Sequence, residues 1–308
     1  MSQADDDIFI PHNMMYNDWF LEQLTYNGIY PNECPGPDGR VPAPPQNWDA
    51  LNQRLSRRRA SLTESSFSEA DFKRFRHVSA NSHYKGAILK DVLPTIWGKM
   101  KTKAYVLGRG GSFDHLAPFS MEWPLPTAVL DYYNGARQES LGLQIREAIH
   151  DQVIPWLGDE AEAPLAPNFF VEVSDPSHPT AVCFRNACHA GAIGCRGVQA
   201  LQSYHRDETF YDHKAYTITV TYASGLLSLY AHHAIPHVPG VRSCHPSDYI
   251  MTQLGAWSMI HDAATFRQGA TAFRNALDWT REELDKAVIS ANKTELLPDN
   301  HARRCRNV

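Results

Sequence analysis

The sequence predicts an α/β fold in which a mixed β-sheet is flanked by helices. Between residues 104 and 233 the apolar patterns indicate, in order, a loop or strand, a strand containing Asp131, a helix, a strand containing Glu172, a helix and a β-hairpin. Strands that alternate with helices in this way are typical of a sheet covered by helices. Further helices are expected before and after this core.

Composition limits the classes of protein to consider. The chain has 308 residues, of which 43% are hydrophobic and 20% charged, as in globular proteins. No stretch approaches the roughly 18 apolar residues that a bilayer-spanning helix needs. The acidic N-terminus does not resemble a signal peptide, and the six cysteines form no CxxC pair. We therefore expect an intracellular protein, nuclear or cytoplasmic, with reduced thiols and no membrane partner.

The N-terminal region, residues 1–103, is expected to be helical and basic. Its predicted parts are helices at 14–29 and 49–58, a Ser-capped helix around Glu69, a helix at 84–96, and a Pro-rich linker or wrapped loop at 30–48. Lys and Arg outnumber Asp and Glu between residues 54 and 109. Such a segment either contacts nucleic-acid phosphates or forms a solvated surface.

The core is expected to span residues 104–293, followed by a tail at 294–308. Its predicted elements are a loop-rich stretch at 104–120 with the glycine cluster GRGGS, a strand at 127–136, a helix at 141–158, a strand at 164–174, a small-residue helix at 180–204, a hairpin at 214–233 and one or two long helices at 249–293. The glycine cluster lacks the GK[ST] ending of a P-loop, so it is weak evidence of phosphate binding.

Glu172 is unexpected in a strand that is otherwise apolar, because an unpaired buried carboxylate is costly. One interpretation is that it lies at a strand end and meets water or an arginine. The other is that it joins Asp131, which also ends an apolar strand, to bind a divalent cation. Mg²⁺ prefers hard oxygen ligands and keeps room for waters and a phosphate.

Several segments in order resemble the PD-(D/E)XK nuclease-like superfamily, and in particular a group of fungal proteins with that domain. The resembling segments are NGIYPN, VLPTIWG, LDYYNGA with Asp131 as the first acid, APNFFVEVS with Glu172 as the second, FRNACHAGAIGCRGVQALQSY, YDHKAYTITVTY and TFRQGATAFRNALDW. The resemblance implies a restriction-endonuclease-like fold, a Mg²⁺ site (with Mn²⁺ as a substitute) at Asp131 and Glu172, and phosphodiester hydrolysis of DNA or RNA.

The sequence departs from that family at two positions that bear on catalysis. Ser174 stands where the family's lysine is expected, and Lys85 stands where a glutamate on the preceding helix is usual. If the lysine's role survives, Lys214 or Arg185 is a candidate to supply it, with His178 in the loop after the strand as a third. Asn186 fills the place of the polar residue that the family carries on the next helix.

Three hypotheses follow for function. The first is a Mg²⁺-dependent nuclease in which Asp131 and Glu172 bind the metal and Asn186 orients water or phosphate. The second is an inactive pseudo-nuclease that binds DNA or RNA through residues 54–109. The third is a module that binds only protein, including a second copy of itself.

Overall fold

A seven-stranded mixed sheet forms the centre of the protein in the computed structural model, which describes residues 18–36, 38–98, 105–155, 163–237 and 246–295. The order of strands is β1-β7-β6-β5-β4-β3-β2. Two neighbouring pairs are parallel, β1 with β7 and β4 with β5, and the other pairs are antiparallel. The predicted α/β class with a mixed sheet flanked by helices is therefore confirmed.

The strands have the following bounds: β1 Ile29–Tyr30, β2 Tyr105–Ser112, β3 Val129–Ala136, β4 Leu165–Val173, β5 Thr217–Ala223, β6 Leu226–Pro236 and β7 Ser247–Ser258. The helices are α1 Asp18–Tyr26, α2 Trp48–Leu55, η2 Ala60–Leu62, α3 Glu69–Asn81, α4 Lys85–Ala87, η3 Ile88–Val92, α5 Leu93–Trp97, η4 Gln138–Ser140, α6 Leu143–Ala148, α7 His150–Val153, α8 Thr180–Ser203 and α9 Ala263–Glu295.

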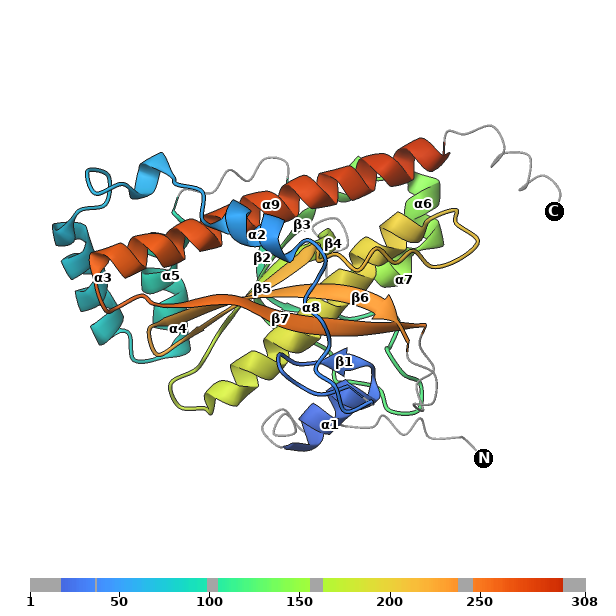
Figure 1. The fold of residues 1–308 in the computed structure, drawn as a ribbon, viewed down its shortest axis with the longest axis horizontal. Helices are drawn as coiled ribbons and strands as arrows, with labels where there is room; N and C mark the ends of the chain where they lie inside the picture. Colours follow the sequence, from blue (N-terminus) through green and yellow to red (C-terminus); the bar gives the residue numbers. More distant parts are fainter. Residues whose placement is uncertain (1–17, 37, 99–104, 156–162, 238–245, 296–308) are drawn as a thin grey trace, which may run out of the picture.

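The two long helices cover opposite faces of the sheet (Figure 1). Phe169, Val171 and Val173 of β4 share a core with α9, whereas Phe170 packs against the small residues of α8. Side chains alternate across a strand, so this division follows directly from the sequence of β4. A third core at one end of the sheet joins α6 and α7 to both long helices.

The N-terminal helices share the core of the sheet. Leu51 of α2, Phe72 of α3 and Ile96 of α5 belong to the same hydrophobic cluster as Val171 and Phe273 of α9. The proline-rich segment wraps over the molecule, and Asn47 at its end bonds the backbone of Ala215 in both directions. The helical region therefore lies close enough to the sheet to contribute side chains to a site there.

Several predicted elements are confirmed with small shifts in their ends. The hairpin turns at Ser224 and Gly225, which both have positive φ, as a two-residue hairpin turn requires. The helix predicted at 180–204 is α8, and the helical segment predicted at 84–96 runs from α4 through a π turn at η3 to α5. The predicted Ser cap three residues before Glu69 would be Ser66, but the cap of α3 is Ser68, which receives a hydrogen bond from the Asp71 amide.

Three predictions are corrected. Residues 247–258 form the strand β7 and not the start of a helix, because β6 pairs along almost all of it and β1 pairs with its first part. The helix predicted at 141–158 is broken at Ile149, whose φ of −126° lies outside the helical region. The glycine cluster is part of β2, and a Cβ at Gly108 would lie 1.9 Å from the Tyr133 ring, so close packing explains that glycine.

Candidate active site at the ends of β3 and β4

Asp131 and Glu172 lie opposite each other where β3 begins and β4 ends, so Asp131 is near the start of its strand and not at the strand end that the sequence predicts. The antiparallel register pairs Tyr132 with Val171, so the next residues outward are the two acids, and opposite residues point to the same face of a sheet. At this point the carboxylates of the two acids, and not backbone carbonyls, accept hydrogen bonds from the amides of the neighbouring strand. The Asp131 amide donates to Glu172 Oε1 at 3.3 Å, and the Val173 amide donates to Asp131 Oδ2 at 2.7 Å.

Glu172 is buried, with 1% of its surface exposed. Burial raises the pKa of its carboxyl well above the usual range, and the charge of Asp131 raises it further, against the opposing effect of Lys85. Asn186 of α8 donates a hydrogen bond to the same carboxyl. Glu172 therefore holds a proton more readily than an exposed carboxylate would.

Lys85 supplies a positive charge to this site. It is the first residue of α4, and its Nζ lies 2.8 Å from Asp131 Oδ1. Burial alone would lower the pKa of Lys85, but the charge of Asp131, its hydrogen bond and the charge of Glu172 outweigh burial and raise it. Lys85 is therefore charged at neutral pH. It comes from a helix far from β3 and β4 in the sequence.

The donor atoms of the pair fit a hard divalent cation. Each carboxylate offers about four lone-pair positions, and the bonds just described occupy only some of them. Among the described residues, the buried Oδ1 of Asn186 accepts no hydrogen bond. Within the described residues, no cluster of three or more His, Cys, Asp or Glu side chains could hold a metal. Two carboxylates suffice for Mg²⁺, which completes its octahedron with water and phosphate oxygens.

Ser174 does not reach toward the pair. Its amide bonds the Tyr222 carbonyl at 2.9 Å, and its hydroxyl makes a 3.5 Å contact with the Asp175 carbonyl. The serine instead lines a cavity of about 230 Å³ together with Tyr222 and Ser79. His178 lies 3.9 Å from the Asp175 carboxylate.

Lys214 is far from the carboxylates, which corrects the expectation that it could assist there. It precedes β5 and pairs with Asp212 at 3.7 Å. The residue of β5 opposite Glu172 is Thr221, seven positions further along the chain. Arg185 is buried on α8, next in sequence to Asn186.

The basic segment at 54–109 is partly neutralised inside the protein. Arg54 and Arg59 form ion pairs with Glu282 and Asp278 of α9, and Arg74 pairs with Asp71. Residues 99–104, which contribute three of the segment's lysines, lie outside the described part of the chain.

The resemblance directs attention to position 85, and Lys85 lies at the start of α4 in contact with Asp131. No local pattern around Lys85 could indicate this contact without the fold.

No protein-family model matches the chain, and no curated protein is similar to it at a significant level. Among the described residues, no helix has both the length and the apolar character to cross a membrane. The candidate site therefore rests on geometry and on the motif resemblance.

Proposed function

We propose that this protein is a metal-dependent phosphodiesterase of the restriction-endonuclease-like kind, in which Lys85 performs the role of the missing lysine at position 174. The observation that carries the proposal is the 2.8 Å contact between Lys85 and Asp131, with Glu172 directly across the strand pair. An acidic pair that can hold a metal ion, with an ammonium beside it, is a set of groups that supports hydrolysis of a phosphodiester.

Asp131 and Glu172 are the residues that would hold Mg²⁺ or Mn²⁺. A bound cation polarises the phosphate and lowers the pKa of a bound water. Glu172 gives up its proton when it becomes a ligand, since only the carboxylate form binds a cation well. Asn186 fixes the orientation of Glu172 through its hydrogen bond.

Lys85 has two functions in this scheme. Its ammonium has three donors, one of which bonds Asp131, so the others can hold an attacking water or a phosphate oxygen. It also offsets the negative charge that develops on the phosphate in the transition state. The cavity beside Ser174, Tyr222 and Arg76 gives a neighbouring nucleotide unit a place to lie.

The experiment is cleavage of labelled single-stranded DNA, duplex DNA and RNA with Mg²⁺ or Mn²⁺, with and without EDTA. Lys85→Met is expected to lower the rate by about 100-fold or more, as removal of a group that stabilises the transition state does. Lys90→Met is the matched control, because Lys90 is exposed on the same helical segment. Its rate should stay within about twofold of wild type.

A second function is favoured by the same ion pair. Lys85 already neutralises Asp131, and Glu172 is disposed to hold a proton, so the site is electrically balanced without a cation. A non-cleaving module that binds nucleic acid or protein is consistent with that balance. Salt-sensitive DNA or RNA binding that persists in Glu172→Gln, together with no cleavage by wild type, would select it over the nuclease.

A further inference from the structure

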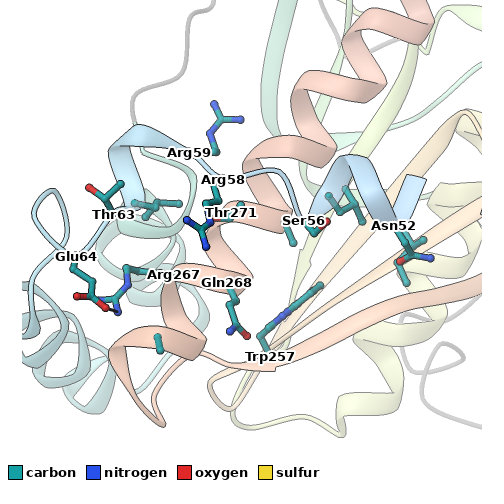
Figure 2. Close-up of a pocket in the computed structure, with 15 residues that line it drawn as sticks. Asn52, Ser56, Arg58, Arg59, Thr63, Glu64, Trp257, Arg267, Gln268 and Thr271 are labelled. Carbon is teal, nitrogen blue, oxygen red and sulfur yellow. Dashed lines mark hydrogen bonds and ion pairs between the residues drawn. The ribbon is translucent and has the colours of Figure 1, made fainter. Parts of the chain in front are cut away.

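A second cavity lies between α2, η2, α9 and β7 and has a volume of about 760 Å³ (Figure 2). This is within the range of about 300–1,000 Å³ that is usual for small-molecule sites. Its inner surface is apolar, and polar side chains gather around it. The apolar lining residues are Leu55, Leu62, Leu254, Trp257, Ala264 and Ala272.

Trp257 forms a fixed aromatic wall of this cavity. A Cβ at Gly255 would lie 2.7 Å from the far edge of the indole ring, and one at Gly269 would lie 2.9 Å from the Trp257 Cβ. Both positions therefore need glycine for the tryptophan to sit where it does. Gln268 of α9 reaches toward the same wall (Figure 2) and offers an amide donor and acceptor.

The arginines around the cavity are used in different ways. Arg59 points away from it (Figure 2) and is bonded to Asn275 and Asp278. Arg267 is held by the Phe67 carbonyl and meets Glu64 at 3.4 Å.

Two cationic groups are therefore accessible to a ligand. The Glu64 side chain that faces Arg267 is 90% exposed, so a bound anion could displace it. Arg58 is exposed and makes no ion pair or side-chain hydrogen bond within the described residues, and it points toward Gln268 in Figure 2.

We propose that this cavity binds a nucleotide, with the base stacked on Trp257 and the phosphate bound by Arg58 and Arg267. Every base has a π-face that stacks on an aromatic side chain, and a guanidinium matches a phosphate in charge and in geometry. The edge of the base meets the Gln268 amide. The ligand is either a free mononucleotide or the phosphorylated end of a nucleic acid, since both present this chemistry.

The experiment is calorimetric titration of the full chain with adenosine 5′-monophosphate in EDTA, which prevents any contribution from a metal at Asp131 and Glu172. Adenosine and inorganic phosphate are titrated separately and should each bind at least about tenfold more weakly. Competition by a 5′-phosphorylated single-stranded oligonucleotide, against the same oligonucleotide without the phosphate, distinguishes the two sources. Tighter binding of the phosphorylated strand than of the mononucleotide assigns the site to a nucleic-acid end, and the reverse order assigns it to a free nucleotide.

Arg58→Ala should weaken binding of the mononucleotide about tenfold or more. Arg57→Ala is the matched control, because it removes the same charge from an exposed neighbour that does not line the cavity, and it should change affinity less than about twofold. Equal loss in both variants, no saturable binding, or phosphate that binds as tightly as the mononucleotide would overturn the proposal. Because the titration is metal-free, its failure leaves the proposed hydrolase untouched.

Discussion

The site where β3 begins and β4 ends and the cavity beside Trp257 both receive a cation from the N-terminal helical region, but they hold it differently. At the strand ends Lys85 is bonded to Asp131 and partly buried. At the cavity Arg58 is exposed, with no ion pair among the described residues. A charge bonded inside the fold is part of its stability, whereas an exposed and unbonded charge is available to a ligand at little structural cost.

The largest expected effect is the difference in folding stability between variants of Lys85 and variants of Arg58. Lys85→Met should lower the free energy of unfolding by about 1–3 kcal/mol, because Asp131 loses a charged hydrogen-bond partner. Arg58→Met should change it by less than about 0.5 kcal/mol. Urea denaturation at pH 7 measures both.

The pH dependence of folding stability tests whether Lys85 stabilises the protein in its charged form. Since the pKa of Lys85 is raised in the folded state, its contribution is complete below about pH 10 and is lost as the pH rises through the folded value. Equal destabilisation by the Lys85 and Arg58 variants would remove the distinction between the regions.

The next effect concerns the proton on Glu172. Because burial raises the pKa of this carboxyl, cation binding must displace a proton while the pH is below the folded pKa. Mn²⁺ affinity should then rise by up to about tenfold per pH unit in that range. Calorimetry in two buffers of different ionisation enthalpy should show proton release, and a pH-independent affinity would contradict the role given to Glu172.

Glu172→Gln should also change stability in the metal-free protein. The raised pKa means that wild type loses stability as the pH rises above about 4, where the unfolded carboxyl ionises, whereas glutamine does not titrate. The variant should therefore gain on wild type between pH 4 and 8 in EDTA. Thermal denaturation across that range measures the difference, and a variant that loses stability relative to wild type as the pH rises would count against a desolvated carboxyl.

The smallest expected effect comes from a change at Lys214, which lies outside the site at Asp131 and Glu172. Lys214→Ala should alter cation affinity and cleavage by less than about twofold, because the register places Lys214 well away from Glu172. The same assays with Lys85→Met provide the contrast. A large loss of cation affinity or cleavage in Lys214→Ala would contradict the separation between Lys214 and Glu172 that the register of β4 and β5 gives.

Sequence pattern was sufficient for the elements whose signal is local. The hairpin carries β-branched alternation on either side of Ser224 and Gly225, β4 is apolar apart from Asn168 and Glu172, and α8 is rich in small residues. The pattern over β7 predicts a helix because Ile250, Leu254 and Trp257 have helical spacing, and only the pairing with β6 shows that the segment is a strand. Pairing with neighbouring strands therefore affects strand formation more than the intrinsic strand preference of the residues does.

The candidate site was half predictable for the same reason. Asp131 and Glu172 each follow apolar residues, so the pattern singles out both acids. It predicts Asp131 at a strand end, whereas Asp131 lies near the start of β3 and meets Glu172 through the antiparallel pairing of the two strands. The partner Lys85 comes from a short helix whose approach depends on packing of Ile88 and Val92 into the core. Arg58 and the wall at Trp257 depend on tertiary contacts between α2, α9 and β7, which no local motif records.

The most direct test of the account is calorimetric binding of Mn²⁺ at pH 7.5 to wild type and Glu172→Gln. The glutamine keeps an oxygen that can accept the bond from the Asp131 amide, so the variant tests the charge and not the fold. We predict one saturable site in wild type, weakened about tenfold or more in the variant. Absence of binding to wild type, or equal binding to both proteins, would contradict a cation site at Asp131 and Glu172.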